Sequence, residues 1–127
     1  WRKVGLTASL SLALDYVFLN LILKNVVARV RPYVLLEGLQ LITREPSDYS
    51  FPSGHTGSAF AVASVLFLCM SPKAGIPAMI LAALIAFSRL YLGAHFPTDV
   101  MGGAIIGCLT GVIAWKLVWK RKTGTVR

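Results

Sequence analysis

Residues 50–70, SFPSGHTGSAFAVASVLFLCM, decide the class of fold, because a short polar opening leads directly into an apolar run. From Thr56 to Met70 no charged residue interrupts that run. Three other long apolar stretches occur, at 4–23, 76–92 and 100–119. About 20 residues of this kind span the ~30 Å hydrocarbon layer of a bilayer as a helix. The sequence therefore predicts an all-α fold, a polytopic transmembrane bundle with about four membrane-spanning helices.

The composition argues against a soluble globular protein. Hydrophobic residues make up 56% of the 127 residues, and charged residues only 14%. A chain this short cannot bury four such runs in one soluble core. Because no domain boundary, repeat or low-complexity tract interrupts the chain, we expect residues 1–127 to form a single membrane-embedded domain.

The net charge of +8 could indicate a nucleic-acid partner, but the basic residues sort by helix end instead of forming one face. With a cytoplasmic N-terminus, one side carries basic residues and no acids: Arg2, Lys3, Lys73, Lys116, Lys120, Arg121, Lys122 and Arg127. The other side mixes both signs: Lys24, Arg29, Arg31, Arg44 and Arg89 with Glu37, Glu45, Asp48 and Asp99. This asymmetry follows the positive-inside rule and predicts a cell-membrane protein with cytoplasmic termini and no nucleic-acid partner.

The same topology brings the unusual polar residues together at the outer face. They are Lys24, Arg31, Ser53, Gly54, His55, Ser88, Arg89, His95 and Asp99. Taken singly, each has an ordinary explanation, such as a basic residue flanking a helix or a helix N-cap. Together they supply what phosphoryl transfer requires: cations to hold the phosphate, a nucleophile, a proton donor and an orienting carboxylate. The N-terminus of the helix at Ser53 and Gly54 adds backbone N–H groups for an anion.

The spacing of these residues resembles a three-part signature. Lys24-x6-Arg31-Pro32, Pro52-Ser53-Gly54-His55 and Ser88-Arg89-x5-His95-x3-Asp99 are similar, in order and spacing, to the motifs of the type 2 phosphatidic acid phosphatase superfamily. Members of that family in membranes typically have six helices with the signature on the last four. The resemblance therefore implies a membrane-embedded phosphatase domain that either lacks two upstream helices or is a minimal version of the family.

The resemblance also implies a role for each matching residue. His95 would be the nucleophile that forms a phosphohistidine, and Asp99 would hold its other ring nitrogen. His55 would protonate the leaving oxygen. The phosphoryl group would be bound by Lys24, Arg31 and Arg89, with hydrogen bonds from Ser53, Gly54 and, to a lesser degree, Ser88.

We expect hydrolysis without a metal or other cofactor, because the fixed cations can take the place of a metal ion. Neutral His95 and charged His55 together predict a bell-shaped rate profile between mildly acidic and neutral pH. The outer acids show no recognisable metal-ligand spacing.

The membrane setting predicts a lipid phosphate or diphosphate as substrate. Undecaprenyl diphosphate is favoured, followed by phosphatidylglycerol phosphate and phosphatidate. Residues 33–44, YVLLEGLQLITR, place Leu35, Leu36, Leu39 and Ile42 near helical spacing, which predicts a short outer helix. This helix would lie in the membrane interface or simply pack as part of the outer loop.

Two features of the helices indicate packing. The glycines at 103, 107 and 111 line one face of the last helix, where intramolecular contact is favoured over a dimer. Asp15 should face the bundle interior, with a partner expected in helices upstream of this chain.

Two other functions remain open. A vanadium haloperoxidase uses a similar pocket, although those enzymes are typically large and soluble. A non-enzymatic transporter or channel would use the outer basic site only to bind an anion.

Overall fold

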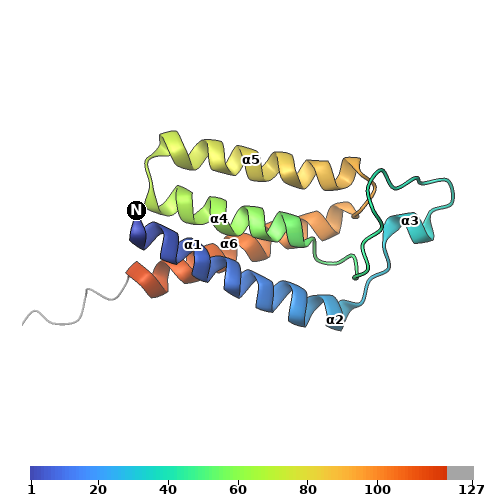
Figure 1. The fold of residues 1–127 in the computed structure, drawn as a ribbon, viewed down its shortest axis with the longest axis horizontal. Helices are drawn as coiled ribbons and strands as arrows, with labels where there is room; N and C mark the ends of the chain where they lie inside the picture. The colour runs from blue at the N-terminus through green and yellow to red at the C-terminus, as the bar shows by residue number, and fades with distance from the viewer. Residues whose placement is uncertain (120–127) are drawn as a thin grey trace, which may run out of the picture.

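The computed structural model describes residues 1–119 as a bundle of helices joined by one long loop (Figure 1). The first helical rod comprises α1 (Arg2–Asp15), a π-helical segment η1 (Tyr16–Leu23) and α2 (Lys24–Val27). One turn of helix, α3 (Pro32–Leu35), follows it. The remaining helices are α4 (Gly54–Cys69), α5 (Pro72–Tyr91) and α6 (Pro97–Trp119). The predicted all-α membrane bundle is confirmed.

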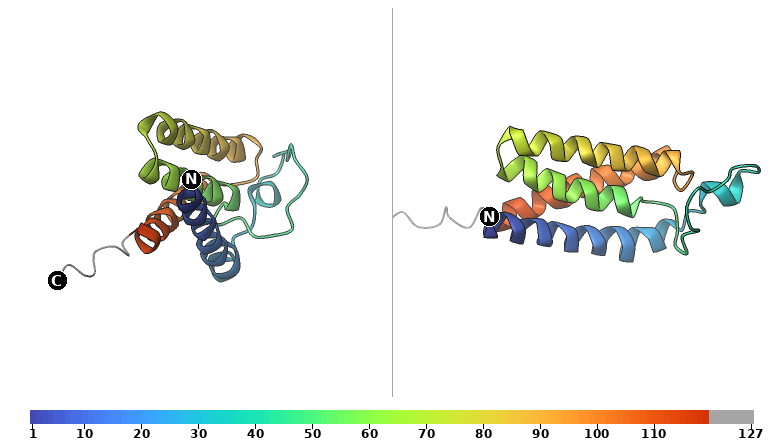
Figure 2. Two further views of the ribbon diagram at one scale, coloured as in Figure 1. Left: turned by 60° about the vertical axis from the view of Figure 1, so that its left-hand side comes forward. Right: turned by 45° about the horizontal axis from the view of Figure 1, so that its top comes forward.

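Helix α4 lies at the centre of the bundle and packs against α1, α5 and α6 (Figures 1 and 2). Its buried face is made of small residues, including Gly57, Ala61 and Ser64. Small side chains let neighbouring backbones approach closely, which is how helices associate without a hydrophobic driving force between them. The centre of the bundle is therefore close-packed backbone and not a layer of large side chains.

The predicted glycine contacts of α6 fall within the chain. A Cβ added at Gly107 would lie 2.3 Å from the carbonyl oxygen of Gly57, and one at Gly103 would lie 2.5 Å from that of Ser53. Gly111 faces Ser64 in the same way, with a Cβ at 2.7 Å from the Ser64 Cβ. The three glycines thus set the spacing between α6 and α4, as expected for intramolecular packing.

Among residues 1–119, three helices are long and apolar enough to cross a membrane. Helix α4 has nearly the predicted bounds, but its 16 residues correspond to only about 24 Å of helix, against ~30 Å of hydrocarbon. Its length follows from its two ends. Ser53 caps the first turn, and the chain at Met70 is already extended. Helix α5 starts at Pro72, earlier than predicted, because proline is well placed in the first turn of a helix.

The outer helix predicted over 33–44 is wrong in its extent. Only Pro32–Leu35 is helical, and the backbone stays irregular up to Ser53. The helix has already ended at Leu36, whose backbone is extended, and Gly38 follows with φ +82°, so the leucines at helical spacing do not lie on one helix. Apolar side chains of this loop are nevertheless exposed, namely Leu35, Leu36, Leu39 and Ile42.

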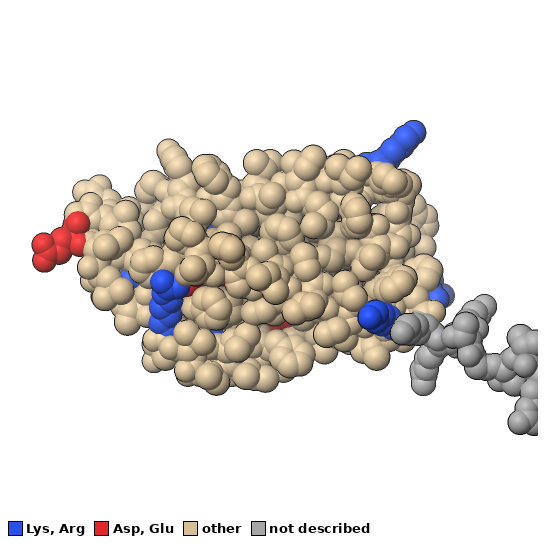
Figure 3. All heavy atoms as spheres, turned by 180° about the vertical axis from the view of Figure 1, so that it is seen from behind, with Lys and Arg blue, Asp and Glu red and all other residues tan. Residues whose placement is uncertain are grey.

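Charge is distributed toward the ends of the bundle, as the sequence predicted. On the face shown in Figure 3, the protruding Lys, Arg, Asp and Glu side chains lie toward the two ends, and nearly all of the surface between them belongs to other residues. Many large apolar side chains are exposed there, among them Phe18, Leu84 and Ile105. A soluble protein rarely exposes so much apolar surface, whereas a lipid-facing one requires it. The chain is a multi-pass membrane protein. The four basic residues at 120, 121, 122 and 127 lie outside the described residues.

Asp15, the carboxylate in the first membrane-spanning run, faces inward as predicted. It is fully buried, and a Cβ at Gly57 would lie 2.9 Å from its Oδ1 atom. The hydroxyl of Ser58 donates to its Oδ2 atom at 3.5 Å. The contacts of Asp15 within this chain are therefore on α4, which the sequence analysis did not anticipate.

Candidate active site

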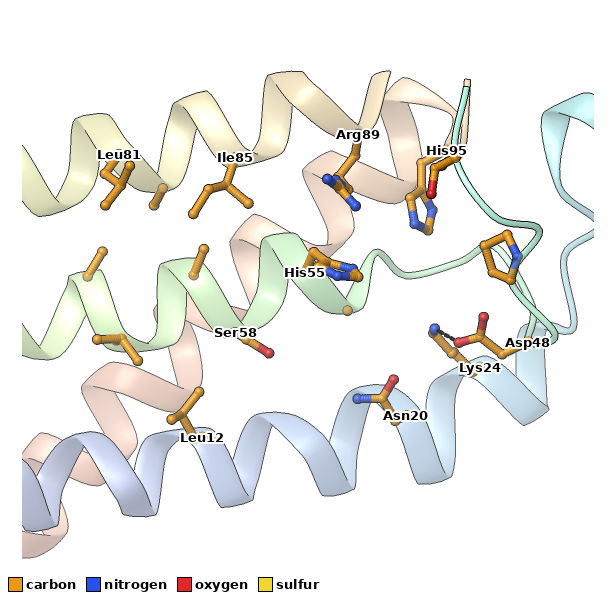
Figure 4. A pocket seen from close by; sticks show the side chains of 18 of the residues that line it. Leu12, Asn20, Lys24, Asp48, His55, Ser58, Leu81, Ile85, Arg89 and His95 are labelled. Atoms are coloured by element: carbon orange, nitrogen blue, oxygen red, sulfur yellow. Dashed lines mark hydrogen bonds and ion pairs between the residues drawn. The ribbon is translucent and has the colours of Figure 1, made fainter. Parts of the chain in front are cut away.

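The helices alternate in direction, so α2, the start of α4, the end of α5 and the start of α6 meet at one end of the bundle (Figure 1). A pocket of about 1000 Å³ opens there. Its polar part is lined by Arg31 and by side chains that converge in Figure 4: Lys24, Asp48, His55, Arg89 and His95. Residues up to 71 positions apart in the sequence therefore share one cavity, as predicted.

Two of the predicted phosphate-binding cations are buried and paired with one carboxylate. Lys24 and Arg31 are 6% and 5% exposed. Lys24 Nζ donates to Asp48 Oδ2, and Arg31 Nη2 donates to Asp48 Oδ1 at 2.6 Å. Burial alone would raise the pKa of Asp48, but the hydrogen bonds from Lys24 and Arg31 outweigh it and hold the pKa below its ordinary value. Asp48 is therefore an ionised carboxylate between two cations.

The His95 imidazole is held from both sides. Arg31 Nη1 lies 3.3 Å from its Nε2 atom, and the Asp99 Oδ2 atom lies 3.6 Å from its Nδ1 atom. A guanidinium can only donate, so Nε2 must accept, and the ring proton of a neutral imidazole is on Nδ1, facing Asp99. Arg31 Nη1 also donates to the Ala94 carbonyl at 2.9 Å, which fixes its position beside the ring.

Asp99 is fully buried at the start of α6 and surrounded by donors. Its Oδ2 atom accepts hydrogen bonds from the Phe96 N–H at 2.8 Å and from the Ser50 hydroxyl. Its Oδ1 atom accepts from Arg29 Nη1 at 3.0 Å. These partners fix the carboxylate behind His95, as the sequence reasoning expected for an orienting acid.

His55 and Arg89 complete the polar part of the pocket. His55, in the first turn of α4, is exposed, and Arg89 projects from the last turn of α5 (Figure 4). Both side chains point toward the space beside His95. Cationic and imidazole groups from three helices, α2, α4 and α5, and from the two connecting segments that hold Arg31 and His95 thus surround one volume.

Two of the predicted ligands lie beside the pocket and not in its lining. The Ser53 hydroxyl accepts from the Thr56 N–H at 3.4 Å and so caps α4, and the Ser53 N–H already donates to the Asp99 carbonyl at 3.0 Å. The Ser88 hydroxyl donates to the carbonyl of Ile85 at 2.6 Å within its own helix. Gly54 does line the pocket. Of the two residues expected to form the anion site at this helix N-terminus, Gly54 lines the pocket and Ser53 does not.

Sequence reasoning missed three residues of the site: Arg29, Asp48 and Ser50. Arg29 lies two residues before Arg31 in a basic segment, which was the one available signal. Asp48 and Ser50 come from an irregular loop whose path no periodicity predicts. Within residues 1–119, no three His, Cys, Asp or Glu side chains gather closely enough to hold a metal ion.

The pocket continues from its polar end into an apolar groove along the bundle. Helix α4 forms its floor, and α1 and α5 form its sides (Figure 4). The apolar lining includes Leu12, Val62, Leu66, Leu81 and Ile85. The polar and apolar parts form one continuous cavity.

Comparison with known proteins gives a family for this arrangement. Residues 4–123 match the model of the PAP2 superfamily. The chain belongs to the PAP2 superfamily. It is 37% identical over 107 residues to an undecaprenyl-diphosphatase from Sulfolobus acidocaldarius, covering 84% of this chain and 51% of that protein. It is 40% identical over 101 residues to phosphatidylglycerophosphatase B from Bacillus subtilis, covering 72% of this chain and 47% of that protein.

A solved PAP2 structure shares this fold. The crystal structure of Aquifex aeolicus LpxE superposes with a TM-score of 0.83 at 35% identity, covering 91% of this chain and 68% of that one. The chain spans about half the length of the two curated PAP2 relatives above.

Proposed function

We propose that the protein is a membrane lipid phosphatase that removes the terminal phosphate of a lipid phosphate or diphosphate through a phosphohistidine on His95. The observation that carries this proposal is the clamped imidazole of His95. Its Nε2 atom faces the pocket beside Arg31, and its Nδ1 atom faces the buried Asp99. This is the arrangement that a neutral nucleophilic imidazole needs.

In the proposed reaction, His95 Nε2 attacks phosphorus and a N–P bond forms while the bond from phosphorus to the lipid oxygen breaks. His55 gives its proton to that leaving oxygen. Water then attacks the phosphohistidine with its proton passing to His55, which releases inorganic phosphate and restores His95. The proton balance closes over the two steps.

The cations of the pocket stabilise the charge on the phosphoryl oxygens. Lys24 and Arg31 are almost fully buried, where a charge interaction is stronger than in water. Arg89 approaches from the opposite wall. Because three cations already face the phosphate position, we propose a reaction that needs no metal ion.

The apolar groove supports a lipid substrate. Its residues run from the polar pocket toward the middle of the bundle, so a hydrocarbon tail can lie in the groove while the phosphate contacts the cations. We propose undecaprenyl diphosphate as the first candidate. Two similar proteins are named undecaprenyl-diphosphatase and phosphatidylglycerophosphatase B, so phosphatidylglycerol phosphate is the second candidate, and phosphatidate, a further lipid phosphate, is the third.

The sorting of basic residues supports an orientation for this site. Arg2, Lys3 and Lys73 lie at the end of the bundle opposite the pocket, where positive charge favours the cytoplasm. We therefore propose that the pocket opens on the extracytoplasmic face of the cell membrane.

The test is phosphate release from a panel of these lipids in detergent, with a chelator present, by wild type and His95→Ala. We expect turnover of at least one lipid by wild type and none by the variant. No turnover of any lipid would contradict the proposal. Bromide oxidation with vanadate and peroxide, or anion flux that persists in His95→Ala, would support one of the two other functions.

A further inference from the structure

Arg29 lies on the far side of Asp99 from the pocket. It does not line the polar part of the pocket, whereas Arg31, two residues later, contacts His95 Nε2 at 3.3 Å. Arg29 Nη1 instead contacts Asp99 Oδ1 at 3.0 Å. The two arginines therefore bracket the His95–Asp99 pair at opposite ends, and only one of them can reach a bound phosphate.

The local structure holds Arg29 in this position. Helix α2 is followed by its C-cap Ala28, a residue with φ +48° at which the chain leaves the helix. The Arg29 guanidinium then lies over the Phe96 ring, 4.1 Å from its centroid, and donates to the Thr98 hydroxyl. A planar guanidinium suits this combination of ring stacking and directed hydrogen bonds, which an ammonium provides less well.

The charge of Arg29 acts on the nucleophile through Asp99. A carboxylate beside an imidazole favours the protonated ring, which cannot attack phosphorus. A cation on the other carboxylate oxygen offsets that effect and leaves the Asp99 carboxylate, 3.6 Å from Nδ1, to orient the ring. Asp99 is fully buried, so little solvent screens this pair, although the Arg29 side chain is 35% exposed.

We propose that Arg29 is a positioning residue that keeps His95 in its neutral, attacking form by neutralising Asp99 from behind. This inference rests on the proposed function, because it assigns Arg29 a part in the same reaction. The other charged and titratable groups near His95 are Arg31, Lys24, Arg89, Asp48 and His55, all on the pocket side.

The test compares two uncharged variants, Arg29→Gln and Arg29→Leu, with the charge-retaining variant Arg29→Lys. For the uncharged variants we expect the acid limb of the kcat/KM profile to move to higher pH by about one pH unit, while the alkaline limb stays in place. Arg29→Lys should keep the acid limb close to that of wild type. A uniform loss of kcat/KM at every pH would overturn the proposal and leave Arg29 a purely structural role.

A second measurement does not depend on catalysis. Diethyl pyrocarbonate modifies neutral imidazole, so mass spectrometry of His95 across pH follows its protonation in wild type and in each variant. We expect the half-reaction pH to rise in Arg29→Gln and Arg29→Leu but not in Arg29→Lys, and equal values in all four proteins would overturn the inference. If wild type hydrolyses no lipid, the proposed function fails, and this measurement still decides the role of Arg29.

Discussion

Arg31 Nη1 lies 3.3 Å from the Nε2 atom of His95. The cation therefore occupies the side of the imidazole from which a phosphoryl group would arrive, and its Nη2 atom is bound to Asp48 at 2.6 Å. An entering phosphate that replaces the Asp48 carboxylate on the Arg31 guanidinium would lie next to Nε2 of His95. The predictions for Arg31 and Asp48 follow from this geometry.

Arg31→Lys should lower kcat/KM by about 10²–10³-fold, because lysine keeps the charge but loses the planar fork that grips two oxygens. The measurement is steady-state hydrolysis of the best lipid in detergent. Arg2→Lys, at the opposite end of the bundle, is the control and should retain full activity. Equal rates for Arg31→Lys and wild type would show that the fork does not hold the phosphoryl group.

Asp48→Asn should strengthen inhibition by inorganic phosphate by about three- to tenfold, because the carboxylate that competes for Lys24 and Arg31 is gone. Inhibition constants for wild type and variant at one ionic strength provide the measurement. Glu45→Gln removes an acid that lines the same pocket but forms no ion pair with Lys24 or Arg31, and it serves as control. Weaker inhibition in Asp48→Asn would mean that Asp48 instead prearranges the cations for phosphate.

The stability of the protein should also depend on Asp48 in acid. Its folded-state pKa is depressed, so its ion pairs stabilise the fold above the unfolded pKa, and this contribution is lost as pH falls through the folded pKa. The side chain is half exposed, which limits the contribution to about 1 kcal/mol or less. Thermal midpoints in detergent should be higher for wild type than for Asp48→Asn at neutral pH, and the two should converge as pH falls below the depressed pKa of Asp48. A difference in thermal midpoint between wild type and Asp48→Asn that stays constant at all pH values would argue against ionisation of Asp48 as its cause.

Gly107→Ala should destabilise the bundle by about 1–3 kcal/mol, because the new Cβ would lie 2.3 Å from a backbone carbonyl that cannot rotate away. The matched control is Gly5→Ala, where no atom lies within 4 Å of the new Cβ. That substitution should be neutral or slightly stabilising, since alanine is the better helix former. Equal thermal midpoints for the two variants would mean that α6 does not depend on close approach to α4.

The apolar groove gives a prediction about substrate length. Ala78 lines the groove, whereas Ala83 is exposed on the same helix away from it. Ala78→Phe should lower kcat/KM for a long-chain lipid by about tenfold, at a cost near 1.4 kcal/mol, and leave a short-chain phosphate unaffected. Ala83→Phe should change neither. An equal loss for both chain lengths would place the effect at the phosphate end and not along the tail.

The bundle and most of the pocket could be predicted because their signals are local. The lengths of the apolar runs predicted the helices. The alternating direction of those helices predicted that Lys24, His55 and Arg89 lie at one end of the bundle. The bounds of α4 were also close to those predicted, whereas α5 begins at Pro72 and not at residue 76, because proline in the first turn extends the helix beyond its apolar run. The Asp48 loop could not be derived, because its contacts join residues 17 to 49 positions apart without any repeat in the sequence.

The roles of Ser53 and Ser88 in phosphate binding stay predictions. Each hydroxyl contacts its own helix: that of Ser53 accepts from the Thr56 N–H, and that of Ser88 donates to the Ile85 carbonyl. Helix capping and bonds to the preceding turn are common uses of serine hydroxyls. Arg29, in contrast, is a residue outside the motifs that contacts the buried Asp99 directly.

The most direct test of the proposed mechanism is to trap the covalent enzyme. The protein is mixed with a lipid diphosphate radiolabelled in its terminal phosphate, quenched in alkali, and digested for mass spectrometry. We predict alkali-stable, acid-labile label on His95 in wild type, and no label in His95→Ala. Continued lipid hydrolysis with no label on His95, or label of equal amount in His95→Ala, would contradict the mechanism.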